Sequence, residues 1–179
     1  MPTLEEYQER VVGTNIDPRS LLCTDYFNHF NEVVMMFTMV GDMPEILDDI
    51  DAWDFKSYRE HFMESGLGFA PLAIECYEVA PNDLRERFEK IATQMSMLIV
   101  ETRVKLRQVW EAGDMDRFKD MANLHSMELQ GMIDDGGAIV HGYKQAFDQE
   151  SVDEMFDDGS GAKPAEGGSS QADIDAMFD

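Results

Sequence analysis

The chain has 179 residues, of which 14 are Lys or Arg and 37 are Asp or Glu, so its formal net charge at pH 7 is −23. This charge repels phosphate backbones and anionic lipid headgroups, so it argues against binding of nucleic acid or of a membrane surface. The chain shows no run of ~18 apolar residues, no secretory signal at its N-terminus and only two cysteines, and we therefore expect a cytoplasmic protein with reduced thiols.

Residues 1–81 are predicted to form an N-terminal helical region. Asp17 and Pro18 place an N-cap residue before a proline that suits the first helical position, so we expect a helix from here to Gly41. Three further helices are expected: a short one through Ile46 and Ile50, one over residues 54–65 that ends at Gly66, and one over residues 70–79 that ends at Pro81.

The strongest helical periodicity lies in residues 82–148. Apolar residues recur every three or four positions from Leu84 to Val109, and again from Met115 onward, with Gly113 and Asp114 between the two runs. The second run keeps its register through the Gly136–Gly137 pair. We therefore predict an all-α fold, a helical bundle built around one long antiparallel hairpin. Its remaining apolar surface would favour a homodimer in the form of a four-helix bundle.

Residues 149–179 are predicted to form a tail. Residues 157–170 contain no large apolar side chain and should form a flexible linker. A nonapeptide recurs on the two sides of this linker, as QESVDEMFD at 149–157 and as QADIDAMFD at 171–179, with five of nine positions identical. Each copy places three apolar residues at i, i+3 and i+4, on one face of a helix. Such a short amphipathic segment folds when that face enters a partner's groove.

The two nonapeptides resemble docking peptides of chemotaxis proteins. QADIDAMFD looks like the N-terminal peptide of the flagellar switch protein FliM, and QESVDEMFD is similar to the C-terminal peptide of the phosphatase CheZ. A helical hairpin, a linker and a docking helix also resemble the layout of CheZ-like proteins. The resemblance implies docking of a CheY-like response regulator, whose receiver domain would hold Mg²⁺, while this chain needs no cofactor. The implied docking positions are Gln171, Ile174, Asp175, Met177 and Phe178, with Val152, Asp153, Met155 and Phe156 as a second site.

The resemblance also points to candidate catalytic residues. CheZ-like phosphatases carry D-x-x-x-Q on the second arm of the hairpin, whereas this chain has the reverse order, Gln130 followed by Asp134. Asp120 and Asn123 form a D-x-x-N spacing, similar to the E-x-x-N of other CheY phosphatases. The candidates are therefore Gln130, Asp134 and Asn123, and the alternative is that they are ordinary polar residues of an exposed helix face. The sequence is compatible both with a protein that promotes dephosphorylation of the regulator and with one that only binds it.

Two other interpretations remain. The chain would be a non-catalytic helical scaffold or coat protein if the acidic tail only increased solubility. It would be a metal-binding bundle if its H-x-x-E pairs held an ion, but they reverse the E-x-x-H order of di-iron bundles, and we predict no metal site. His125 lies on the apolar stripe, where a hydrogen-bonded core histidine is expected. The pairs are His29 with Glu32, His61 with Glu64, and His125 with Glu128.

Overall fold

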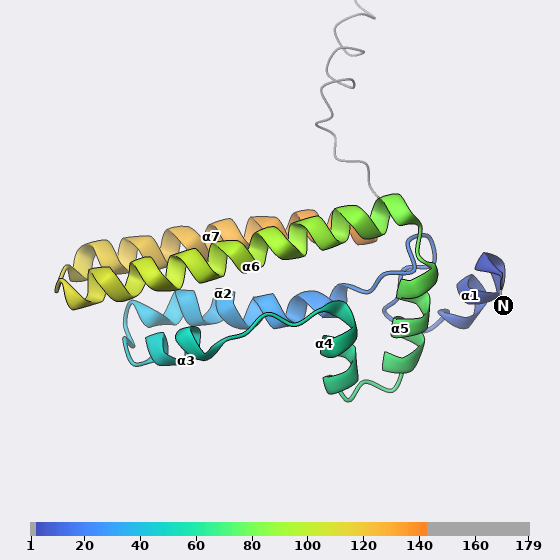
Figure 1. Ribbon diagram of the computed structural model, residues 1–179, viewed down its shortest axis with the longest axis horizontal. Coiled ribbons are helices and arrows are strands. Elements are labelled where there is room, and N and C mark those ends of the chain that lie inside the picture. Colours follow the sequence, from blue (N-terminus) through green and yellow to red (C-terminus); the bar gives the residue numbers. More distant parts are fainter. Residues whose placement is uncertain (1–2, 143–179) are drawn as a thin grey trace, which may run out of the picture. The chain divides into compact units, whose positions relative to one another are not determined.

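The computed structural model describes residues 3–142 (Figure 1). Within these residues the chain forms α-helices, one short 3₁₀ helix and an isolated bridge between Ile16 and Cys23, so the predicted all-α fold is confirmed. Residues 3–142 all belong to one compact unit. The predicted linker and both nonapeptides lie outside the described residues.

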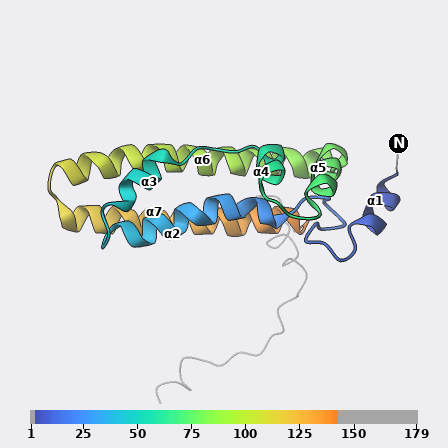
Figure 2. The same ribbon diagram turned by 90° about the horizontal axis from the view of Figure 1, so that it is seen from below.

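The predicted hairpin consists of α6 (Asn82–Glu111) and α7 (Met115–Val140), which pack against each other in opposite directions (Figures 1 and 2). Gly113, with φ of 75°, allows the tight turn between them. The side chain of Asp114 then accepts a hydrogen bond from the backbone N–H of Arg117 and caps α7. Helix α7 continues through Gly136 and Gly137 without a break, as its apolar register predicted.

Helix α2 (Asn28–Val40) lies antiparallel along α7 and completes a core of three long helices (Figures 1 and 2). Its buried stripe includes Phe30 and Phe37, each with no exposed surface. A small polar contact fixes the pair of helices: the hydroxyl of Ser126 on α7 lies 2.9 Å from the hydroxyl of Thr38 and donates to the carbonyl of Val34 at 3.2 Å. One face of the hairpin is therefore covered within the monomer.

Four short helices complete the described fold: α1 (Leu4–Arg10), α3 (Ile46–Ala52), α4 (Tyr58–Glu64) and α5 (Ala70–Val79). Helix α3 packs against α2 and α6, and Arg103 of α6 donates to the carbonyls of Asp51 at 3.3 Å and of Trp53 at 2.9 Å. These bonds satisfy carbonyl groups at the end of α3. An ion pair of 2.7 Å between Arg10 and Glu75 joins α1 to α5.

The prediction of one helix from Pro18 to Gly41 is wrong for the first part of this segment. Residues 17–22 form a turn, the 3₁₀ helix η1 (Thr24–Phe27) follows, and α2 begins only at Asn28. The carboxylate of Asp17 accepts from the backbone N–H of Arg19 at 2.8 Å, and Leu21 adopts a left-handed φ of 58°. This turn leaves Leu21 and Leu22 with no exposed surface. Burial of both leucines thus overrides the local helix signal.

The helix predicted over residues 54–65 is too long at its N-terminal end, because α4 begins later than predicted. The backbone of the segment before α4 bonds to distant side chains instead. The carbonyl of Asp54 lies 2.8 Å from Nε2 of His29, and the carbonyl of Lys56 accepts from the hydroxyl of Tyr26 at 2.8 Å. These tertiary bonds hold the segment outside the helix.

Two helix starts in the described part of the chain carry a capping box, in which a Ser or Thr hydroxyl and a Glu carboxylate bond to each other's backbone N–H. Ser57 and Glu60 form one at the start of α4, and Thr3 and Glu6 form another at the start of α1. Helix α1 is absent from the sequence-based predictions, although the T-x-x-E spacing of its capping box indicates where it begins.

A buried histidine lies where α2 meets the segment that follows α3. The ring of His29 stacks on Trp53 with centroids 4.6 Å apart, and it lies 6.3 Å from the ring of His61. Burial lowers the pKa of His29. Burial, followed by the charge of His29, also lowers the pKa of His61. The folded state therefore favours both rings in the neutral form.

We expect the free energy of unfolding to fall between pH 7.5 and pH 5.5. The unfolded chain binds protons at the ordinary histidine pKa of about 6.5, whereas the folded chain binds them only at lower pH, so acidification favours unfolding. This contribution to stability is fully present above the ordinary pKa and is lost as the pH falls from there toward the lower pKa of the folded state. Urea unfolding at the two pH values measures the change, and His29→Gln should reduce it. Equal stability at both pH values would contradict the prediction.

Candidate functional site

The three catalytic candidates predicted from the sequence lie on the outer face of α7. Asn123, Gln130 and Asp134 are seven and four positions apart, which places them on one side of a helix. Nε2 of Gln130 donates to Oδ1 of Asp134 at 3.0 Å. Asn123 lies about 10 Å further along the helix axis, at 1.5 Å per residue. The structure thus brings Gln130 and Asp134 together and leaves Asn123 two turns away.

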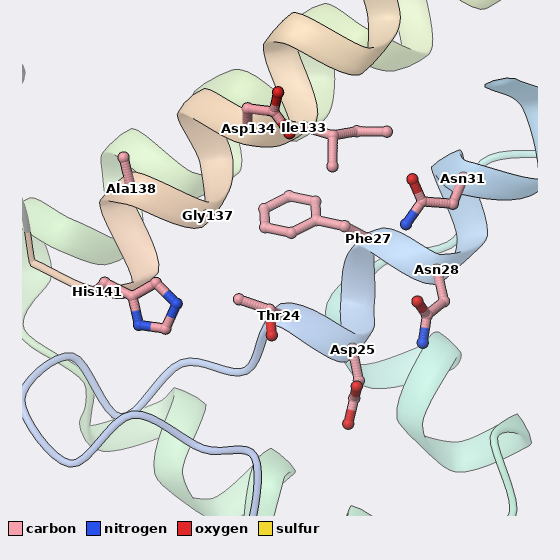
Figure 3. A pocket seen from close by; sticks show the side chains of 10 residues that line it. All are labelled: Thr24, Asp25, Phe27, Asn28, Asn31, Ile133, Asp134, Gly137, Ala138 and His141. Atoms are coloured by element: carbon pink, nitrogen blue, oxygen red, sulfur yellow. The ribbon is translucent and has the colours of Figure 1, made fainter.

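Asp134 also lines an open pocket of about 520 Å³ between the start of α2 and the end of α7 (Figure 3). Helix α2 contributes Asn28 and Asn31, and η1 contributes Asp25. His141, just after α7, lines the same pocket. We call this surface the α2–α7 pocket. It combines amide, carboxylate and imidazole groups that come from distant parts of the chain.

The aromatic wall of the α2–α7 pocket depends on a glycine. In Figure 3 the ring of Phe27, which precedes α2, points toward α7 and lies beside Gly137 and Ile133. A Cβ at the neighbouring Gly136 would lie only 2.4 Å from Cζ of Phe27. The ring therefore occupies space that any other residue at position 136 would fill. This contact sets how closely α2 approaches α7 beside the pocket.

Hydrogen bonds tie the pocket to the N-terminal turn. Nδ1 of His141 lies 3.1 Å from Oδ2 of Asp17. Burial opposes ionisation of Asp17, but the hydrogen bonds from Arg19 and His141 outweigh it and lower the pKa of Asp17 to about 2. Asp25 accepts from Nδ2 of Asn15 at 2.9 Å. The turn found in place of the predicted helix start thus supports one end of the pocket.

The H-x-x-E pairs do not assemble into a metal site in the part of the chain that the structure describes. Across residues 3–142 there is no group of three or more His, Cys, Asp or Glu side chains that could hold a metal ion. His125 instead lies 2.9 Å from its neighbour Glu128, and His29 contacts the carbonyl of Asp54. His125 is hydrogen-bonded, as expected, but it is only partly buried and its partner is exposed, so it is not the core histidine that was expected.

The polar residues that α2 and η1 bring to the pocket are not among the sequence-based candidates. Asp25 and Asn28 have the same D-x-x-N spacing as Asp120 and Asn123, so a signal is present in the sequence. Nothing local indicates that they lie near Asp134, because this depends on the packing of α2 on α7. The docking positions of the two nonapeptides, residues 152–156 and 171–178, lie outside the described residues.

Comparison with known protein families, with curated proteins and with solved structures finds no match to this chain. Among the helices of residues 3–142, none combines the length and the apolar content that crossing a membrane requires.

Proposed function

We propose that this chain is a chemotaxis or flagellar signalling protein that docks a CheY-like response regulator through its C-terminal peptide. The observation that carries the proposal is the repeated nonapeptide, QESVDEMFD and QADIDAMFD. In each copy, apolar residues spaced i, i+3 and i+4 stand among acidic residues, a sequence pattern that suits an apolar groove with basic residues at its edge. Two linked copies raise the local concentration of the regulator at this protein.

The proposal extends to the body of the protein. Gln130 and Asp134 supply an amide and a carboxylate beside the α2–α7 pocket, and Asn28 and Asn31 supply further amides. Such groups can orient a water molecule toward an aspartyl phosphate of the docked regulator and so promote its dephosphorylation. The receiver domain would supply the Mg²⁺. The proposed location of this activity is the cytoplasm.

A homodimer through the hairpin is part of the same proposal. Met97, Val100 and Val104 form an outer stripe on α6, at 58%, 42% and 52% exposure. They are spaced i, i+3 and i+7, as residues of a helix–helix contact are. A second copy of the hairpin would cover this stripe.

A protein that binds the regulator without promoting its dephosphorylation is the second candidate. It is favoured by the order of Gln130 and Asp134, which is the reverse of the CheZ pattern, and by the hydrogen bond that these side chains make with each other. Such a protein would leave the lifetime of the regulator's phosphoryl group unchanged.

The test is a titration of the full chain with CheY-like receivers, with and without beryllofluoride as the phosphoryl mimic. We expect binding that depends on the mimic and that Phe178→Ala weakens about tenfold, because large apolar anchors carry most of such binding energy. Ser170→Ala, just before the second nonapeptide, is the matched control. Absence of binding to any receiver would contradict the docking proposal.

The same complexes separate the two candidates. Dephosphorylation of the bound regulator should be slower with the Gln130→Ala variant. Gln94→Ala, which changes an exposed glutamine of α6, is the control and should leave the rate unchanged. Binding with no acceleration of dephosphorylation would establish the second candidate instead.

A further inference from the structure

Helices α2 and α7, which lie side by side (Figures 1 and 2), both expose large apolar side chains. On α2 these are Met35 and Met39, one turn apart, and on α7 they are Leu124 and Met127. Met35 is 58% exposed and Met127 is 76% exposed. Exposed apolar residues are usually scattered singly over a protein surface, so their position relative to one another decides whether they form a patch.

The register of the two helices brings these residues together. The hydroxyl of Ser126 contacts both Val34 and Thr38, which places Ser126 level with the residue midway between them. The helices run in opposite directions, so the next residue of α7, Met127, lies level with Met35. One turn away, the other two exposed apolar residues are also level with each other. The four side chains therefore form one patch across the two helices.

Both methionines of the first pair lie on the side of the helix contact at which the α2–α7 pocket opens. Met35 follows the pocket residue Asn31 by about one turn, and Met127 precedes the pocket residue Asp134 by about two turns. Residues separated by whole turns share a helix face. We call the surface that the four exposed apolar residues form the methionine face: Met35, Met39, Leu124 and Met127.

The charged side chains that α2 and α7 place around the methionine face are mostly acidic. Helix α2 contains no Lys or Arg, and the two basic residues of α7, Arg117 and Lys119, lie near its start. Lys119 is already paired with Asp42 at 2.8 Å. The two helices also carry five exposed acidic residues: Glu32, Asp120, Glu128, Asp134 and Asp135. The methionine face therefore combines apolar side chains with negative charge.

We propose that the methionine face binds an amphipathic helix of a partner protein that carries basic residues beside its apolar stripe. Methionine side chains are unbranched and polarizable, so they adapt to apolar residues of different shapes. The surrounding carboxylates attract Lys and Arg on the partner. A second copy of the methionine face would bring carboxylates against carboxylates, so charge disfavours this chain itself as the occupant. The proposal does not rest on regulator docking, because neither nonapeptide enters it.

Titration of the full chain with model peptides tests the proposal. The probe is a peptide of about 14 leucine and lysine residues, roughly four helical turns, with all leucines on one face. Its control has the same composition in an order that gives no apolar face. We expect the amphipathic peptide to bind about tenfold more tightly, because only its leucine face can cover the methionines. Equal affinities would show attraction to net charge alone, and they would overturn the proposal, as would no binding of the amphipathic peptide.

Variants of the chain locate the binding site. Met35→Ser combined with Met127→Ser should weaken binding of the amphipathic peptide about tenfold, because two apolar contacts are lost. Met63→Ser is the matched control, since Met63 is an exposed methionine of α4 and lies outside the methionine face. It should leave the affinity unchanged. Equal affinities of the double variant and the control for the peptide would place binding elsewhere and overturn the proposal.

Methyl NMR with isotope-labelled methionine locates the peptide without any substitution. We expect the amphipathic peptide to shift the methyl signals of Met35, Met39 and Met127 and to leave that of Met63 in place. Shifts confined to methionines outside the methionine face would contradict the proposed surface.

Discussion

Gly136→Ala is expected to lower the free energy of unfolding by about 2–3 kcal/mol, because overpacking a tight core site costs more than the helix gains from alanine. The new Cβ would lie 2.4 Å from Cζ and 2.8 Å from Cε1 of Phe27, closer than non-bonded carbon atoms can approach. Phe27 has 2% exposure and its ring packs against those of Tyr26 and Phe88, so it cannot move without displacing them. Urea unfolding followed by circular dichroism measures the change.

Two variants separate this clash from other effects of the substitution. Gly131→Ala, in the same helix, meets nothing within 4 Å and should raise stability by about 0.5–1 kcal/mol through helix propensity. Gly136→Ala combined with Phe27→Leu should cost less than the sum of the two single changes, because the ring that clashes is absent. An alanine variant at position 136 that is as stable as the wild type would contradict the predicted contact.

Phe88→Ala is expected to lower the free energy of unfolding by about 3–5 kcal/mol, the usual cost of removing a buried aromatic ring. Phe88 is 1% exposed and lies at the centre of a cluster of aromatic rings. Its ring centroid is 5.2 Å from those of Tyr26 and Phe27 and 5.7 Å from that of Tyr58. The substitution therefore leaves a cavity where η1, α4 and α6 meet.

Phe55→Ala is the matched control, because the same side chain is removed from a position where the ring is 45% exposed. Its cost should be about 1 kcal/mol, since much of this ring is in water in the folded state. The same urea unfolding experiment compares the two variants. Equal losses would show that the rings contribute by their number and not by their burial.

The candidate site was only partly predictable from the sequence. Gln130 and Asp134 are four positions apart on a predicted helix, and this spacing alone places their side chains within reach of each other. Their neighbours in the α2–α7 pocket, Asn28 and Asn31, come from a helix far earlier in the chain. No local pattern specifies such a pairing, because it arises from the packing of one helix on another.

Local sequence patterns were enough to predict the all-α class, the hairpin of α6 and α7 and the turn at Gly113, because helical periodicity and capping act between residues a few positions apart. The positions where α2 and α4 begin depend instead on tertiary packing. Burial of Leu21 and Leu22 produced a turn after Asp17, and bonds from Tyr26 and His29 held residues 54–56 outside α4. In both places, contacts between distant residues contributed more than local helix preference, because burial and satisfied hydrogen bonds outweigh propensity differences of a few tenths of a kcal/mol to about 1 kcal/mol per residue.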